Sequence, residues 1–407
     1  MATSRYWVED ILTGIVLTQD LPLNDVQVSD QLNRPGALRG SLPVSSSFAT
    51  EELLDEGRRA IYWERDGKVE FGGILWSVQR GLGDRKLTLD VEGWLGYWDH
   101  RDIWRDRTFT NTEQFTIFQT LVNDAQDDAY STASGGPGAS SNLGITVTWD
   151  AASGVLRNRL DDFRDHKAQN LGEALRRLAG VGSGFDYGMV YGLNLTTNRI
   201  TKAIKLYYPT RGRNTGYLFE FDAGTTRSVT TPVVVTDGGV VVTDGGAVVT
   251  DGVETVATGT QYAPRGNISR WGVARDASRM AWKARGWGNG YEADRLRSTQ
   301  TTEARRGVYP PLDVAFTEFS SVEQQATLNE NTLAALRRRD HPTRLPSIEI
   351  NPAMFPKWGD WELGDVVSLR IDDGYGSVGA DVPVSVRVVG WSVDPRTDRP
   401  VLTLEEV

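Results

Sequence analysis

Short segments in which apolar and polar residues alternate, separated by turn-forming residues, dominate both ends of this chain. Between Lys86 and Val91 every second residue is apolar, and residues 384–388 repeat the pattern near the other end. This period is that of a strand with one buried face. Asp66-Gly67 and the segment Asp394–Asp398 have turn composition and lie between such strands. We therefore expect antiparallel sheets or barrels at both ends.

The middle of the chain has the period of helices instead. Apolar residues recur three and four positions apart in two segments, at Phe115, Phe118, Leu121 and Val122, and at Leu171, Ala174, Leu175 and Leu178. A short helix is also expected over Thr50–Gly57, capped by Thr50, and another over Ser321–Arg338. The helix expected over Ser321–Arg338 has an incomplete apolar stripe at Val322, Ala326, Leu333 and Leu336. The predicted fold class is mainly β with α+β elements.

Composition excludes several functions. The 407 residues suffice for roughly two to four compact units. A net charge of -10 argues against a surface that grips nucleic acid phosphates or an anionic membrane. The absence of cysteine excludes disulfides, thiolate zinc sites and cysteine nucleophiles. The first residues lack the apolar segment of a signal peptide, and no stretch approaches the ~18 apolar residues of a membrane span, so we expect cytoplasmic synthesis without a membrane anchor.

A low-complexity segment between Thr231 and Gly252 repeats every seven residues. Asp-Gly pairs at Asp237, Asp244 and Asp251 alternate with β-prone residues, which favours narrow hairpins or a finger. The spacing matches neither a helix–loop–helix calcium loop nor a glycine-rich calcium repeat, so we predict no metal site there.

No spacing in the sequence assembles an active site. His100, His166 and His341 each stand beside charged residues, far from one another, and are expected on the surface. Gly180–Gly184 lacks the spacing of a nucleophile elbow, and Gly286–Gly290 lacks that of a phosphate-binding loop. We predict no catalytic residues, cofactor or metal. Paired carboxylates among the 54 acidic residues leave an all-β glycosidase as an alternative.

Tryptophan is unusually frequent, with 13 residues, several of them close to turns. Core packing is the default role for each, but such side chains also suit protein interfaces and sugar platforms. A receptor-binding or carbohydrate-binding protein is therefore a second alternative.

Five segments carry a resemblance to a known family. They are L-N-R-P-G (Leu32–Gly36), F-G-G-I-L (Phe71–Leu75), L-D-V-E-G-W-L-G-Y (Leu89–Tyr97), W-E-L-G-D-V-V (Trp361–Val367) and V-R-V-V-G-W-S-V-D (Val386–Asp394). In content and order they resemble the minor tail proteins of long-tailed phages (siphoviruses) of actinobacteria, which are similar to the baseplate or tail-tip hub family.

The resemblance implies two hub-type β-barrels per chain with peripheral α/β domains. We expect the first barrel in residues 1–104 and a helix-containing α+β domain in residues 105–201. The second barrel would be discontinuous, in residues 202–229 and 346–407, and an inserted domain with the repeat and a helix would occupy residues 230–345.

The resemblance also implies a function: a non-enzymatic tail-tip hub of the virion, assembled in the host cytoplasm. Such a subunit would form a homotrimer and join the tail tube or distal tail protein to the tape measure protein and other minor tail proteins. Its acidic channel would let DNA pass without specific binding. Because the sequence ends in the closing strand, we expect any cell-wall enzyme to be a separate protein.

Overall fold

The computed structural model describes most of the chain. The described residues are 3–81, 83–127, 142–150, 158–164, 169–180, 184–194, 199–222, 228–235, 241–242, 255–260, 266–291, 294–302, 308–317, 319, 322, 324–337, 339–340, 343–372 and 383–407. Strands predominate, helices occupy two peripheral regions, and the fold class is mainly β with α+β elements, as predicted. One 13-stranded sheet runs through both ends of the chain.

The first part of this sheet is built from β1 to β7 in the spatial order β3-β4-β7-β6-β5-β1-β2, and neighbouring strands are antiparallel. Asp66 and Gly67 have φ of 50° and 86°, which gives the tight turn expected between β5 and β6. Leu21, in the segment that leads from β2 into β3, donates its N–H to Tyr6 O of β1 at 2.9 Å, so the chain that enters β3 at one end of this sheet is held against β1 near the other end. The strands are β1 (Ser4–Asp10), β2 (Ile15–Thr18), β3 (Asn24–Gln31), β4 (Arg34–Pro43), β5 (Arg59–Arg65), β6 (Lys68–Gln79) and β7 (Lys86–Gly93).

The second part of the sheet closes in a similar way through one side chain. Asn267 accepts a hydrogen bond from Glu220 N at 2.9 Å and donates to Leu218 O at 2.8 Å. It thereby supplies hydrogen-bond partners to backbone groups on the edge of β13 that lies next to β17. The strands are β13 (Asn214–Asp222), β17 (Ile268–Asp276), β21 (Thr343–Ile350), β22 (Val366–Asp372), β23 (Val384–Val393) and β24 (Val401–Glu406). The turn Asp394–Asp398 joins β23 to β24, as predicted.

The two barrel-like parts share one ladder and one core. Residues 28–31 of β3 pair with residues 390–393 of β23, and Leu32 N donates to Val389 O at 3.0 Å. Side chains from both parts form a single hydrophobic cluster, which includes Val28, Trp63, Val388 and Trp391. Neither part can therefore shift far without exposing the core of the other.

A helical domain covers the outer face of the first barrel. Its core residues come from α1 and α3 and pack against β5 and β6 through the 3₁₀ helix η1 (Trp94–His100). The apolar positions predicted for both helices are buried. The elements are α1 (Gln114–Ala125), α3 (Leu171–Gly180), the β9–β12–β11 sheet of β9 (Ile145–Trp149), β12 (Arg199–Tyr207) and β11 (Asp186–Asn194), and the pair β8 (Arg107–Glu113) and β10 (Asn158–Phe163).

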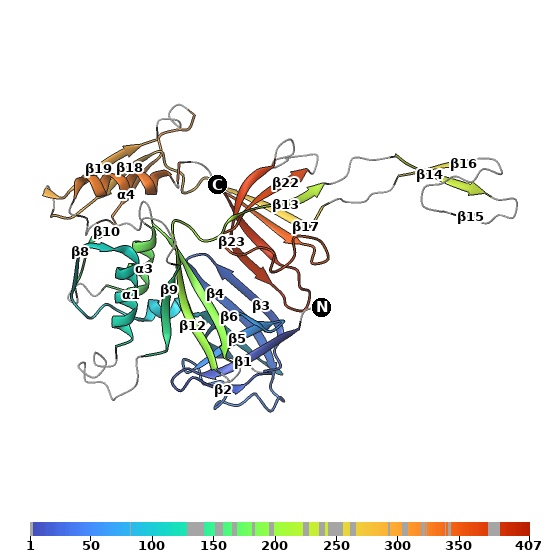
Figure 1. Cartoon of the computed structure of the whole chain (residues 1–407), viewed down its shortest axis with the longest axis horizontal. Helices are drawn as coiled ribbons and strands as arrows, with labels where there is room; N and C mark the ends of the chain where they lie inside the picture. The colour runs from blue at the N-terminus through green and yellow to red at the C-terminus, as the bar shows by residue number, and fades with distance from the viewer. Residues whose placement is uncertain are drawn as a thin grey trace.

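Two further units lie between β13 and β21 in sequence (Figure 1). The first is a narrow sheet of β14 (Ser228–Val235), β15 (Val241–Val242) and β16 (Thr255–Thr260), which stands away from the body. Asp237, Asp244 and Asp251 of the seven-residue repeat lie outside the described residues. The second unit packs α4 (Gln325–Arg337) on β18 (Lys283–Trp287), β19 (Arg297–Thr301) and β20 (Asp313–Phe316) around a separate small core.

Two helix predictions need correction. Thr50 forms a single turn, in which its hydroxyl accepts Leu53 N at 3.2 Å, but no helix follows. One turn fixes several residues for one hydrogen bond, and the chain instead enters β5 at Arg59. The last helix begins at Gln325 rather than Ser321 and buries Leu328, Asn331, Thr332 and Leu336, while Ala326 is exposed.

Strand pairing also changes two expected boundaries. β12 pairs with β9 and β11, so residues 202–207 lie in the sheet of the helical domain and not in the second barrel. β17 pairs with β21, so residues 268–276 belong to the second barrel and not to the inserted domain. The rest of the domain division stays a prediction.

Candidate assembly site

The two barrels and the helical domain meet at Asp186, the first residue of β11. Its carboxylate accepts hydrogen bonds from Asn33 Nδ2 at 2.8 Å, from Arg211 N at 2.8 Å and from the Arg387 guanidinium. Arg387 also donates to Arg211 O at 2.9 Å and to Gly364 O at 3.0 Å. Asn33 comes from the β3–β4 hairpin, Asp186 from the helical domain and Arg387 from β23. This one junction therefore fixes three parts of the chain to one another.

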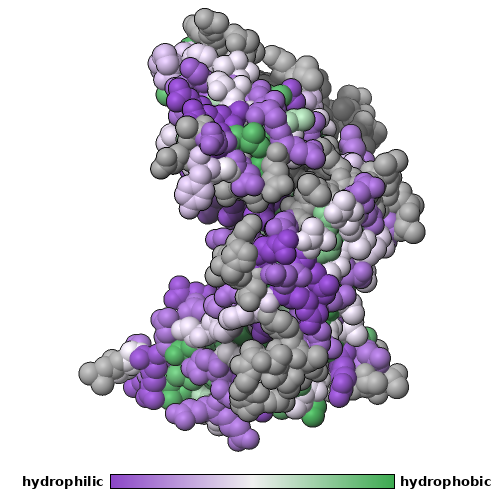
Figure 2. Space-filling model, turned by 90° about the vertical axis from the view of Figure 1, so that its left-hand side faces the viewer, coloured by the Kyte–Doolittle hydropathy of each residue, from purple (hydrophilic) through white to green (hydrophobic). Residues whose placement is uncertain are grey.

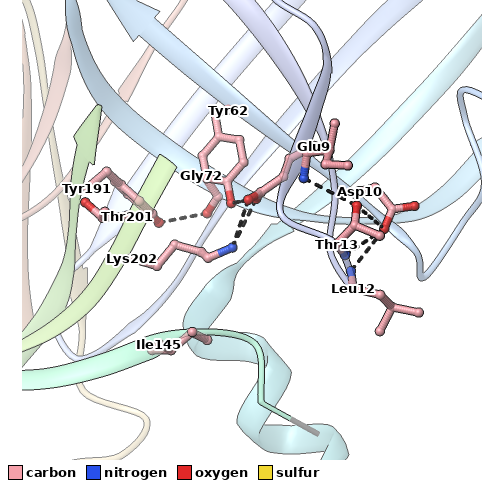
Figure 3. A network of polar contacts seen from close by, with 12 residues as sticks. Glu9, Asp10, Leu12, Thr13, Tyr62, Gly72, Ile145, Tyr191, Thr201 and Lys202 are labelled. Atoms are coloured by element: carbon pink, nitrogen blue, oxygen red, sulfur yellow. Dashed lines mark hydrogen bonds and ion pairs between the residues drawn. The ribbon is translucent and has the colours of Figure 1, made fainter. Parts of the chain in front are cut away.

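A second buried junction joins β12 to the first barrel. Lys202 Nζ lies 3.0 Å from Glu9 Oε2 and 3.2 Å from Oε1, and Tyr62 donates its hydroxyl to the same carboxylate (Figure 3). Glu9 is 1% and Lys202 5% exposed, and the ammonium lies 4.8 Å from the centroid of the Trp94 ring. Burial, reinforced by Glu9, raises the pKa of Tyr62 well above its ordinary value, so the hydroxyl stays a neutral donor.

An aromatic cluster lines the seam between the barrels. Trp358 makes edge contacts with Trp63, Trp361 and Trp391, with ring centroids 5.8, 5.4 and 4.8 Å apart. Arg65 places its guanidinium 5.2 Å from the Trp358 ring and donates to Asp398 at 2.8 Å. Arg65 ends β5 and Asp398 lies in the turn between β23 and β24, so this ion pair also connects the two barrels.

Most tryptophans serve the interior. Six are buried, namely Trp7, Trp63, Trp94, Trp98, Trp361 and Trp391, and six more are half-buried. Trp104 is the tryptophan with a largely exposed side chain, at 52%. Most tryptophans of this chain therefore pack in its cores and in the seam between the barrels, which is the default role expected from the sequence.

Exposed apolar side chains gather at the outer edge of the first barrel. Within the described residues β2 pairs only with β1; its Ile15 and Leu17 are 53% and 43% exposed, and Leu12 in the turn before it is 51% exposed. The face in Figure 2 is mainly hydrophilic, with small separate hydrophobic areas. An apolar edge strand is a surface that native proteins cover or pair. This edge is the strongest candidate for contact with another protein.

A cavity of ≈ 330 Å³ opens where the three parts meet. Asp30 of β3 lies in its wall, surrounded by protein although part of its surface reaches the cavity. Burial raises the pKa of this carboxyl to about 6, against the opposing effects of Arg211 and of the hydrogen bond from Gln31 N at 2.9 Å. Because Tyr191 stays neutral beside it, Arg211 is the charge that stabilises the Asp30 carboxylate.

The raised pKa of Asp30 makes the stability of the protein depend on pH. The folded carboxyl binds its proton more tightly than the unfolded one, so folding is favoured below the ordinary value of 3.8 and loses stability as pH rises to about 6. Asp30→Asn is therefore expected to raise the free energy of unfolding at pH 8 by about 1–3 kcal/mol and to leave it unchanged at pH 3. Urea unfolding at both pH values measures this; an equal effect at both would contradict it.

The structure places the remaining motifs outside any shared site. His100 is exposed and stacks on Trp76 at 4.5 Å, whereas His166 and His341 lie outside the described residues. Gly286 and Trp287 are the last residues of β18, and Gly288–Gly290 follow the strand; Gly286 lets α4 approach, since a Cβ there would lie 2.0 Å from Thr332 Oγ1. Gly180 ends α3, and residues 181–183 lie outside the described part.

Within the described residues, no group of three or more His, Asp or Glu side chains is placed to hold a metal ion. Among these residues no helix has the length and apolar character needed to cross a bilayer.

The fold is similar to that of several solved bacteriophage tail proteins. The structure is similar over 98% of its length to prophage tail protein gp18 of Listeria monocytogenes, with TM-score 0.51, 13% identity and 94% of that chain covered. It is likewise similar to a tail protein of Neisseria meningitidis (TM-score 0.52, 14% identity, 98% and 96% covered) and to the 43 kDa tail protein of prophage MuSo2 from Shewanella oneidensis (0.51, 12%, 99% and 98%). No family model and no curated protein sequence matches the chain.

Proposed function

We propose that this chain is a structural hub subunit of the phage tail tip, or baseplate, of a long-tailed phage of actinobacteria. The observation that carries the proposal is the coverage: three phage tail proteins match almost the whole chain and are themselves matched almost completely. The chain would act in the virion by holding other proteins in place rather than by catalysis.

The rigid union of two barrels supports a hub role. Each copy offers two barrel-like parts whose orientation is fixed by the β3–β23 pairing and the Asp186 junction. A ring of three copies would then present six similar parts toward a six-fold tube and three-fold symmetry toward the tip. The proposed partners are the tail tube or distal tail protein, the tape measure protein and other minor tail proteins, around a channel through which DNA passes without specific binding.

Assembly into a trimer is the first expected result. The purified chain should elute as one species with three times the monomer mass in size-exclusion chromatography with light scattering. Electron micrographs should show rings that cap isolated tail tubes. A monomer at micromolar concentration would contradict the hub proposal.

The edge of β2 is the surface that we expect copies to use. Ile15→Glu with Leu17→Glu places charges on this exposed apolar edge and should give monomers with an unchanged melting temperature. Tyr291→Glu alters a side chain that is 90% exposed in the separate α4 unit and should leave the trimer intact. If the variant with Ile15→Glu and Leu17→Glu still forms a trimer, the edge of β2 is not the surface between copies, but the hub proposal itself stands.

A further inference from the structure

The cavity where the barrels and the helical domain meet has the size of a ligand site. Its ≈ 330 Å³ falls within the ~300–1,000 Å³ typical of small-molecule pockets, which often lie between domains. All three parts of the chain contribute to its wall. The lining residues that carry the argument are two aromatic residues, Tyr207 and Trp358, and six charged ones, Asp30, Lys68, Glu70, Lys205, Arg211 and Glu362.

Two aromatic rings in the wall are held in place by their neighbours. Trp358 is half-buried and is fixed by the edge contacts with Trp63 and Trp391 and by the Arg65 guanidinium. Tyr207 has the charged groups of Lys205 and Arg211 at 5.5 and 5.3 Å from its ring centroid. Because these rings are already ordered, a ligand that stacks on them loses little side-chain entropy.

The polar groups in the wall balance in charge. The wall contains three carboxylates, of Asp30, Glu70 and Glu362, and three cations, of Lys68, Lys205 and Arg211. Carboxylates only accept hydrogen bonds, whereas ammonium and guanidinium groups only donate them. The wall therefore offers many donors and acceptors but no net charge. A strongly charged ligand gains little here, and a neutral ligand that both donates and accepts gains most.

We propose that this cavity binds a neutral saccharide of one or two rings. Sugar rings have apolar C–H faces, which suit the Trp358 and Tyr207 rings, and hydroxyl edges, which donate to carboxylates and accept from cations. Both kinds of group occur together in this wall. The site goes beyond the hub function, and its existence does not depend on whether the chain forms a ring.

The test uses the full chain and three defined disaccharides: maltose, lactose and N,N′-diacetylchitobiose. Saturation-transfer NMR and titration calorimetry at pH 8 should detect at least one of them with a Kd of about 1 mM or tighter. Trp358→Ala should weaken that binding roughly tenfold or more, which corresponds to ~1.4 kcal/mol. Trp104→Ala removes an exposed tryptophan outside the cavity wall and should leave the Kd unchanged.

Glu70→Gln keeps the test decisive if Trp358→Ala does not fold. The change preserves the shape of a partly exposed side chain that pairs with Lys68 at 3.1 Å, and it should weaken binding several-fold while the melting temperature stays constant. The proposal is overturned if no disaccharide binds, or if binding is unaffected by the Glu70 and Trp358 changes. Light scattering on the same samples reports the oligomer separately, so failure of this site and failure of the hub give different results.

Discussion

Replacing Lys202 with methionine is expected to lower the free energy of unfolding by about 3–5 kcal/mol. The change removes the cation that pairs with Glu9, a carboxylate that is 1% exposed, and leaves a charge buried beside the Tyr62 hydroxyl. Methionine retains most of the packing of the lysine stem. Urea unfolding at neutral pH, followed by tryptophan fluorescence, gives the difference directly.

Two variants separate the buried charge from simple loss of packing. Adding Glu9→Gln to Lys202→Met removes the unpaired charge and should restore most of the lost stability. Lys86→Met breaks an ion pair whose members are both 59% exposed and should cost about 1 kcal/mol or less. If the double variant were no more stable than Lys202→Met alone, the cost would not come from the buried charge.

Arg387→Met should have a comparable effect, about 3–5 kcal/mol, at the junction of the three parts. It removes the partner of Asp186, which is 8% exposed, and leaves the carbonyl oxygens of Arg211 and Gly364 without this donor. Denaturant titration measures the loss. Because the guanidinium connects β23 to the helical domain, hydrogen exchange should also become faster in β11 and β23.

The matched control for Arg387 is Arg39→Met. Arg39 pairs with Asp90 at 3.3 Å on the surface of the first barrel, with side chains 65% and 38% exposed. Its loss should cost about 1 kcal/mol or less. Equal destabilisation by the two changes would show that the junction contributes no more than a surface ion pair.

Secondary-structure elements could be predicted where the spacing of apolar residues within a short segment decides the structure. The apolar positions of α1 and α3, the Asp66-Gly67 turn and the alternation in β7 are all set within a few residues, so the sequence alone was sufficient. The Thr50 turn shows the limit: its cap is present, but a strand begins nine residues later. A capping signal marks where a helix can begin and not how long it lasts.

The junctions could not be predicted in the same way, because their members are far apart in sequence. Glu9 and Lys202 are 193 residues apart, and Asp186 and Arg387 are 201 apart. The one signal that the sequence holds is a charge among apolar residues of a strand, as at Arg387 between Val386 and Val388, because such a charge needs a partner when the strand is buried. The pattern does not say which residue the partner is.

The α4 unit begins and ends at paired residues of a single hairpin. Asp276, the last residue of β17, lies opposite Thr343, the first residue of β21. The whole segment between them is thus topologically a loop, and a short turn could replace it without changing the barrel register. The register of the second barrel therefore does not depend on the α4 unit, so this segment can differ in length and sequence while the pairing of β17 with β21 stays the same.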